Sequence, residues 1–157
     1  IRDRFFLNKF DKQDGSPAPL ADARVRQAIR YAIDMSTICE TLFQGAAVPA
    51  NAMAPDANLK GGDLNDYNYN PEKAKELLAE ANWDPNTVIK AVYYYTDQAT
   101  VDLMTAVQAY LADVGIKMEF ELVEGDLATI LWTAPADQTN GPRAVDWDIC
   151  YGTTSNI

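Results

Sequence analysis

Histidine is absent from all 157 residues, and its absence excludes several classes of active site. Ser-His-Asp and Cys-His nucleophile arrangements use an imidazole as the base, and zinc sites with a histidine ligand are excluded as well. Cysteine is scarce, since only Cys39 and Cys150 occur. They could form a disulfide only if their Cα atoms lay within about 7 Å of each other. Buried unpaired thiols are the expectation, because free cysteine is among the most buried residue types.

Basic residues are also few, because 13 Lys and Arg stand against 23 Asp and Glu and give a formal net charge of −10. This charge repels phosphate backbones and anionic membrane surfaces, so we expect no nucleic-acid partner. No apolar run approaches the roughly 20 residues of a membrane-spanning helix. The first residues do not form a basic and apolar signal sequence.

The length and the hydrophobic content of 48% are those of one compact domain, and we expect a single domain over residues 1–157. The chain starts at Ile1 without a methionine and stops shortly after an apolar run. We therefore expect it to be a piece of a longer protein.

The middle of the chain predicts a β-α-β unit. Residues 88–95 are rich in β-branched and aromatic side chains, and residues 116–123 alternate between apolar and charged ones. Gly115 stands where a helix often ends in the left-handed conformation. A helical crossover of this length places its two strands parallel, so the expected fold class is α/β. The apolar residues of the predicted helix recur at steps of three and four: Leu103, Met104, Val107, Tyr110, Leu111 and Val114.

Capping residues and periodicity predict four further helices and two further strands. Asp22 is placed to cap a helix whose apolar stripe is Val25, Ala28, Ile29, Ala32 and Ile33, and Asp34 is expected to close this helix near Ser36. Asn70 and Pro71 begin a helix that ends at Asn82. The remaining predictions are a strand over 4–8, a turn over 14–19, a short helix over 37–43, an irregular crossing over 45–70, a short helix over 126–132, a loop over 135–143 and a strand over 145–151.

Four motifs occur in an order that is characteristic of one family. They are residues 22–34 (DARVRQAIRYAID), 69–83 (YNPEKAKELLAEANW), 111–117 (LADVGIK) and 147–149 (WDI). In this order they closely resemble the family 5 extracellular solute-binding proteins of ABC transporters, the oligopeptide, dipeptide and nickel-binding class. The motifs span nearly the whole chain, and they specify the family but not the ligand.

The resemblance implies a two-lobed, type II-like periplasmic binding protein. This chain would be most of its carboxy-terminal lobe, with a mixed, partly parallel sheet flanked by helices and without the amino-terminal lobe. The whole protein would close around an extracytoplasmic solute and deliver it to an ABC permease, with no catalysis and no cofactor. The setting implied is the periplasm or, for a lipid-anchored lipoprotein, the cell surface. An isolated lobe is expected to bind solute weakly or not at all.

Two stretches are candidates for ligand binding. Ligands in open parallel sheets sit beyond the carboxyl ends of the strands, which points to Tyr95, Thr96 and Asp97. In the family that the chain resembles, the stretch after the last strand also contacts the ligand, often through an acidic residue that pairs with a peptide's α-amine. Its candidates here are Tyr151, Gly152, Thr153, Thr154 and Asn156, none of which carries a carboxylate. Glycine allows a close backbone approach, and the hydroxyl and amide groups suit a peptide or an oligosaccharide.

Several of these residues also have purely structural interpretations. Asp97 can serve as the N-cap of the following helix, and residues 151–157 can be a frayed terminus. Adjacent tyrosines in residues 93–95 must point to opposite faces of a strand, so at least one is expected in the core. Trp132 and Trp147 can stack on a solute or fill the core.

Two other classes of function remain open from the sequence. An enzyme could use Asp146 and Asp148 for acid–base chemistry, since alternate residues of a strand share a face. A structural or interaction module could self-associate through a face that a partner normally covers.

Overall fold

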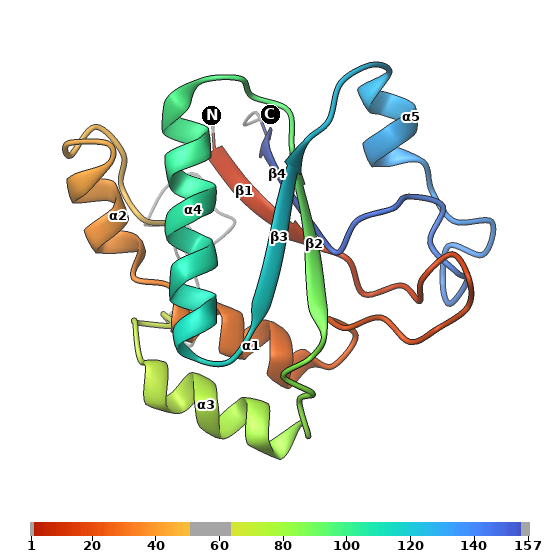
Figure 1. Cartoon of the computed structure of the whole chain (residues 1–157), viewed down its shortest axis with the longest axis horizontal. Helices are drawn as coiled ribbons and strands as arrows, with labels where there is room; N and C mark the ends of the chain where they lie inside the picture. The colour runs from red at the N-terminus through yellow and green to blue at the C-terminus, as the bar shows by residue number, and fades with distance from the viewer. Residues whose placement is uncertain (1, 51–63, 155–157) are drawn as a thin grey trace.

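The computed structural model describes residues 2–50 and 64–154, and within them it forms a four-stranded sheet with helices on both faces (Figure 1). The strand order is β1 (Arg2–Leu7), β4 (Ile149–Thr154), β2 (Val88–Tyr93) and β3 (Lys117–Leu122). The strands β4, β2 and β3 run parallel, whereas β1 is antiparallel to β4. The predicted mixed, partly parallel α/β sheet is therefore confirmed.

The predicted β-α-β unit is also confirmed. β2 and β3 pair in parallel from Val88 opposite Lys117 to Tyr93 opposite Leu122, and α4 (Gln98–Asp113) connects them. Gly115 follows α4 with φ at +93°, in the left-handed region that a helix end requires. The apolar stripe of α4 faces the sheet, where Leu103, Met104, Val107 and Leu111 are buried.

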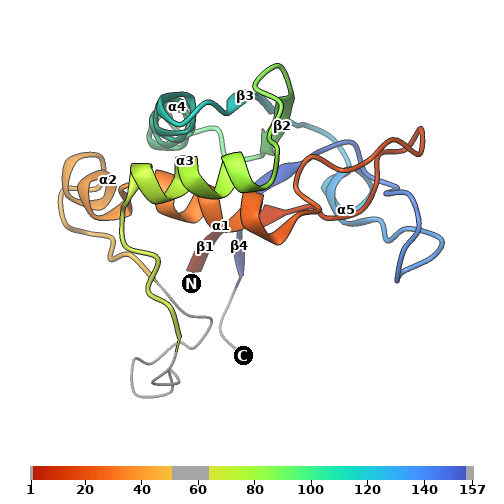
Figure 2. The ribbon, with the colours of Figure 1, turned by 90° about the horizontal axis from the view of Figure 1, so that it is seen from below.

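One face of the sheet is covered by α1 (Ala23–Ala32), α3 (Pro71–Glu80) and α4. Figure 2 shows α1 and α3 side by side, in line with the contacts between them. The stripe predicted for α1 is buried except for Ile33, which is half-buried and follows the helix, and alternate residues of β2 and β4 belong to the same core. These sheet residues are Ile89, Ala91, Tyr93, Ile149 and Tyr151. The main core lies between the helices and this face.

Every helix in the described part of the chain begins after an Asp or Asn whose side chain accepts a main-chain N–H. The predicted caps Asp22 and Asn70 are confirmed. Asp34 has a different role from the one predicted, because α1 ends at Ala32 and Asp34 caps α2 (Met35–Thr41), accepting from the Thr37 N–H at 3.1 Å. The Asp34 carboxylate binds a main-chain N–H that has no partner within the first turn of α2, so it starts the second helix instead of closing the first.

The irregular crossing predicted for residues 45–70 is confirmed for residues 45–50 and 64–70, which contain neither helix nor strand; the remainder lies outside the described residues. Asn82 has φ at +54°, as expected of the residue that ends α3. No helix in residues 2–50 and 64–154 has both the length and the apolar character needed to cross a membrane.

The second face of the sheet is covered by the short helix α5 (Leu127–Trp132) and by the segment that leads into β4. Val92, Leu131, Trp147 and Cys150 form a smaller core there. Cys39 and Cys150 are both buried and unpaired, as predicted. Burial raises the pKa of the Cys150 thiol to about 12, so this thiol stays protonated at neutral pH.

The last strand begins later than predicted, at Ile149 instead of residue 145, and it extends to Thr154. Residues 145–148 alternate between apolar and acidic side chains as a strand would, but they do not join the sheet as β4 does. The Trp147 indole donates instead to the Leu131 carbonyl at 3.2 Å. The Asp148 carboxylate accepts the Lys90 N–H at 2.9 Å, so a side chain takes the place of a strand carbonyl beside β2.

A buried ion pair holds the start of β4 in place. Arg143 Nη1 donates to Asp148 Oδ1 at 2.7 Å, and the two side chains are only 4% and 3% exposed. The guanidinium also donates to the carbonyls of Phe10 and Trp147, at distances between 2.7 and 3.1 Å. The network therefore joins the segment after β1, the strand β2 and the start of β4.

We predict that Asn70→Ala lowers the free energy of unfolding by about 1 kcal/mol, because the Lys73 N–H loses the side chain that caps α3. Urea unfolding followed by circular dichroism measures this change. Asn86→Ala is the matched control, since Asn86 is exposed and caps no helix. Equal losses in the two variants would contradict the capping role.

We predict that Arg143→Met lowers the free energy of unfolding by about 3 to 5 kcal/mol, because it leaves the Asp148 carboxylate buried without its partner. Arg24→Met removes an exposed ion pair with Asp22, which solvent screens, and should therefore change stability far less than Arg143→Met does. Adding Asp148→Asn to Arg143→Met should restore part of the loss. A loss for Arg143→Met no larger than that of the Arg24 variant would contradict the prediction.

Candidate functional site

The carboxyl ends of β2 and β4 lie side by side and bring the two predicted stretches together. Tyr93 pairs with Tyr151 in the parallel register, and the chain continues in step beyond this pair. Tyr94 therefore lies beside Gly152, and Tyr95 lies beside Thr153. We call this edge, made of residues 94–97 and 151–153, the lip.

Two tyrosines hold Thr153 within the lip. The Tyr95 hydroxyl and Thr153 Oγ1 are 2.6 Å apart, and either oxygen can be the donor. The Thr153 N–H donates to the Tyr94 hydroxyl at 3.3 Å. Burial raises the pKa of Tyr95, so its hydroxyl keeps its proton at neutral pH. Thr153 is thus bound through its side chain by one tyrosine and through its main chain by the other.

Gly152 makes room for one of these tyrosines. A Cβ atom at this position would lie 2.8 Å from the Tyr94 hydroxyl oxygen and 3.2 Å from Tyr94 Cε1. The sequence suggested that this glycine lets the backbone come close to a ligand. The close approach present in the structure is made by Tyr94.

Asp97 caps α4, which confirms the structural alternative for this residue. Its carboxylate accepts the Thr100 N–H at 3.1 Å and the Thr100 hydroxyl at 2.8 Å. Thr96 and Asp97 are both exposed on the lip. Thr154 ends β4, and Asn156 lies outside the described residues.

Aromatic rings and one carboxylate extend the lip toward β1. The ring of Tyr151 lies 5.0 Å from that of Phe5 and 6.0 Å from that of Tyr95, while Tyr94 and Tyr95 are 4.6 Å apart. Burial raises the pKa of Tyr151, and the nearby carboxylate of Asp3 raises it further. Phe5 and Asp3 could not be predicted from the sequence, because the antiparallel pairing of β1 with β4 that brings them here leaves no local pattern.

The two tryptophan candidates differ in their surroundings. Trp147 is buried and belongs to the core beneath α5, which confirms its structural interpretation. Trp132 is 47% exposed, and its ring makes edge contacts with Phe6 at 5.2 Å and with Trp147 at 6.1 Å. Among the described residues, neither tryptophan ring pairs with a tyrosine of the lip.

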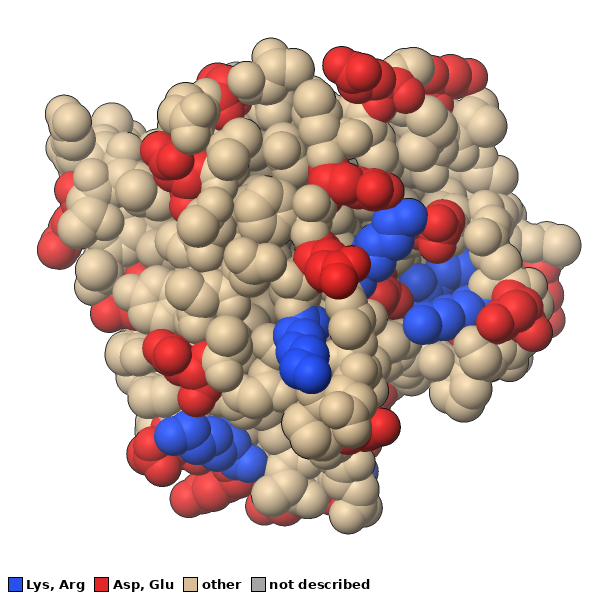
Figure 3. All heavy atoms as spheres, viewed as in Figure 1, with Lys and Arg blue, Asp and Glu red and all other residues tan. Residues whose placement is uncertain are grey.

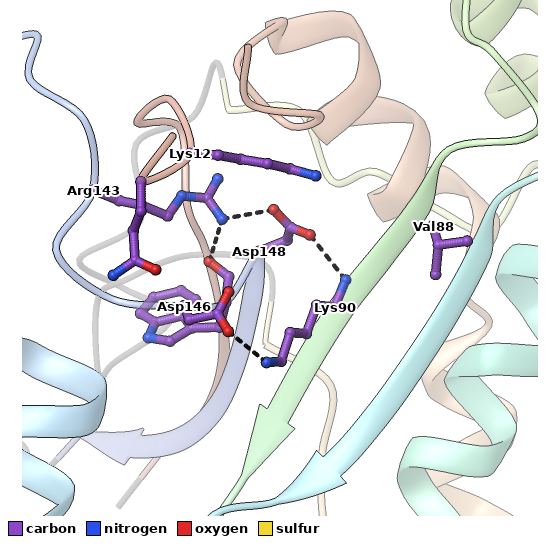
Figure 4. Close-up of a pocket in the computed structure, with 8 residues that line it drawn as sticks. Lys12, Val88, Lys90, Arg143, Asp146 and Asp148 are labelled. Carbon is purple, nitrogen blue, oxygen red and sulfur yellow. Dashed lines mark hydrogen bonds and ion pairs between the residues drawn. The ribbon is translucent and has the colours of Figure 1, made fainter. Parts of the chain in front are cut away.

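A separate hollow of about 130 Å³ lies near the start of β2, and Lys90 and Asp146 also line an adjoining hollow of about 310 Å³ (Figure 4). Lys90 Nζ lies 2.8 Å from Asp146 and 3.1 Å from Glu121. The hydrogen bond that Lys90 donates to the Asp146 carboxylate is the main cause that raises the pKa of Lys90. At about 3.3 Å per residue, Lys90 is roughly 16 Å from Tyr95 along the strand direction.

Asp146 and Asp148 do not form the acid–base pair that the enzyme alternative requires. Both precede β4, so the prediction that they share a strand face is wrong. Figure 4 shows Asp146 directed to Lys90, and Asp148 to Arg143 and the Lys90 main chain. No group of three or more Cys, Asp or Glu side chains in the described ranges is arranged to hold a metal ion. Figure 3 shows acidic side chains spread over the viewed face, as expected from the net charge of −10.

Comparison with known proteins identifies the family. The family model described as "Bacterial extracellular solute-binding proteins, family 5 Middle" matches residues 5–152. A Brucella ovis protein named an ABC transporter peptide-binding protein is 38% identical over 100 residues, which are 62% of this chain and 19% of that protein.

Solved structures share the fold. Lactococcal OppA, complexed with an endogenous peptide in the closed conformation, matches with a TM-score of 0.74 and 20% identity over 96% of this chain and 31% of that one. NikA from Brucella suis in complex with Fe(III)-EDTA matches with a TM-score of 0.71 and 23% identity over 97% of this chain and 30% of that one. The chain spans about a fifth of the length of the curated relatives it matches.

The motifs from residue 22 to residue 149 all lie within the matched region, and the sheet and its helices are those of the solved relatives. The chain therefore belongs to the bacterial extracellular solute-binding proteins of family 5.

Proposed function

We propose that this chain is one lobe of the solute-binding component of an ABC importer, and that its lip is one wall of the solute site. Membership of family 5 supports the class of function. The observation that carries the assignment of the site is the meeting of Tyr95 and Thr153 at the carboxyl ends of two parallel strands, 2.6 Å apart. Open α/β sheets bind ligands beyond this edge.

The proposed site binds a solute without converting it chemically. The side chains that face one another across the lip are hydroxyls and aromatic rings, and the one lip carboxylate, Asp97, is occupied by the start of α4. Hydroxyl pairs and aromatic faces are suited to hydrogen bonding and stacking. The ligand-contacting residues we propose are Tyr95, Thr96, Asp97, Tyr151, Gly152, Thr153, Thr154 and Asn156.

The solute proposed first is a peptide, because the Brucella ovis relative and OppA are named or shown as peptide-binding proteins. An oligosaccharide is the second candidate, since the neutral hydroxyls of Tyr95 and Thr153 suit a hydroxyl-rich solute equally well. An extracytoplasmic location, as a periplasmic protein or a surface lipoprotein, and delivery to an ABC permease follow from the same proposal.

The 157-residue chain alone should bind solute poorly. A second lobe would supply the other half of the contacts, and association costs several kcal/mol before any contact contributes to affinity. We therefore expect a binding pocket to form only when two lobes close together.

The full-length protein is expected to melt at a higher temperature with at least one compound of a screen containing alanine di- to pentapeptides, maltotriose and Fe(III)-EDTA. Differential scanning fluorimetry measures the shift. The 157-residue chain should bind no compound of the screen tighter than about millimolar, because half of the site is missing. A micromolar ligand for this chain would contradict the one-lobe proposal, and a full-length protein that no compound shifts would contradict solute binding.

The role of the lip can be tested in the same protein. Thr153→Val removes a hydroxyl that faces the solute and should raise the Kd of the bound compound by about threefold to tenfold, the value of one neutral hydrogen bond. Thr105→Val is the matched control, because Thr105 is exposed on α4 and its hydroxyl donates to the Val101 carbonyl of the same helix. Isothermal titration calorimetry gives both constants. An unchanged Kd in Thr153→Val would show that the solute binds elsewhere.

A further inference from the structure

The end of β4 is held by two consecutive tyrosines that follow β2. Tyr94 and Tyr95 come directly after Tyr93, the last residue of β2, and their ring centroids lie 4.6 Å apart. The ring of Tyr94 lies against Gly152, and the hydroxyl of Tyr95 meets Thr153 Oγ1 at 2.6 Å. The Thr153 N–H donates to the Tyr94 hydroxyl at 3.3 Å. Tyr94 therefore holds the main chain of Thr153, and Tyr95 holds its side chain.

The position of Tyr94 depends in turn on the absence of a side chain at residue 152. A Cβ there would lie 2.8 Å from the Tyr94 oxygen, closer than a real Cβ contact. The Tyr94 and Tyr95 rings are 4.6 Å apart and tilted by 43°, and the Tyr95 ring meets that of Tyr151 at 6.0 Å. Tyr94 is thus packed between Tyr95 and Gly152.

We propose that Tyr94 is a positioning residue for solute binding: through the Thr153 main chain, it orients the Tyr95–Thr153 hydroxyl pair toward an uncharged solute group with a donor and an acceptor side by side. The proposal rests on the proposed function of the lip. A peptide amide unit and the neighbouring hydroxyls of a sugar both present such a group, and the experiment below separates them.

The chemistry of the hydroxyl pair determines the class of solute group. Two hydroxyls carry two hydrogens, and the contact between Tyr95 and Thr153 uses one of them. The second hydrogen can be donated to the neighbouring Tyr94 hydroxyl or to a solute, and the remaining lone pairs accept. Because either oxygen can be the donor within the pair, donor and acceptor can exchange places without moving a heavy atom. The pair therefore complements a neutral group that both donates and accepts.

A double-mutant cycle in the full-length protein tests whether Tyr94 affects solute binding through Thr153. The variants are Tyr94→Phe, Thr153→Val and the double variant, titrated with trialanine and with maltotriose. We expect each single variant to raise the Kd of the compound that binds by about threefold to tenfold, and the double variant to raise it no more than the larger single change. Non-additivity is the expected result because Tyr94 acts through Thr153.

Two further variants serve as a control and as an independent test of the position of Tyr94. Tyr110→Phe is the matched control on α4, where the Tyr110 ring packs at 5.7 Å on that of Tyr69, far along the chain from the lip; its Kd should be unchanged. Gly152→Ala pushes the Tyr94 ring away and should raise the Kd as Tyr94→Phe does. Hydrogen exchange of the Thr153 amide should be faster in Tyr94→Phe than in Tyr110→Phe.

The outcomes are distinct. An unchanged Kd in Tyr94→Phe, or changes that add in the double variant, overturns the positioning role while the proposed function of the lip stands. If the wild-type protein binds no compound of the screen, the proposed function fails and the role of Tyr94 fails with it. Binding of trialanine assigns the recognised group to a peptide amide, whereas binding of maltotriose assigns it to neighbouring hydroxyls; binding of Fe(III)-EDTA alone overturns the assignment to a neutral group.

Discussion

The buried ion pair between Arg143 and Asp148 is the interaction on which the arrangement of the site depends, because it determines where β4 enters the sheet. Asp148 accepts both the guanidinium and the Lys90 N–H, while Arg143 also binds the Phe10 carbonyl. These partners belong to three separate segments, so none can shift alone without leaving a buried charge or carbonyl unsatisfied. Side chains alternate along a strand, and a slip of one residue would exchange the faces of Tyr151 and Gly152. The contacts of the lip thus depend on a charge pair at the opposite end of the strand.

Much of the architecture could be predicted from the sequence because its determinants are local. The β-branched and aromatic run of residues 88–95 predicted β2, the helical stripe and Gly115 predicted α4, and the alternation in residues 116–123 predicted β3, with boundaries close to those observed. Asn70 and Pro71 predicted the start of α3 for the same reason, since a cap acts within one turn of helix. Where a residue's role depends on distant partners, the prediction was less accurate. Residues 145–148 look like strand, but Asp148 and Trp147 are drawn to Arg143 and Leu131.

In the candidate site too, features with local determinants could be predicted, and features that depend on distant partners could not. The rule that ligands bind beyond the carboxyl ends of parallel strands predicted that Tyr95 would lie at an important edge, and the structure places Thr153 against it. Neither the place of Tyr94 over Gly152 nor the approach of Asp3 to Tyr151 could be predicted, because both depend on how β4 pairs with its two neighbours. The interpretation of Asp146 and Asp148 as a reactive pair failed for a related reason: each carboxylate has its own cation.

The close fit between Tyr94 and Gly152 also constrains how this family can change over evolution. Any residue larger than glycine at position 152 needs the space that the Tyr94 ring now fills, and a small residue at position 94 leaves a gap above glycine. A substitution at either position therefore changes the packing at the other. We expect the two positions to vary as a pair among related proteins, with a bulky side chain on β4 accompanied by a small one after β2.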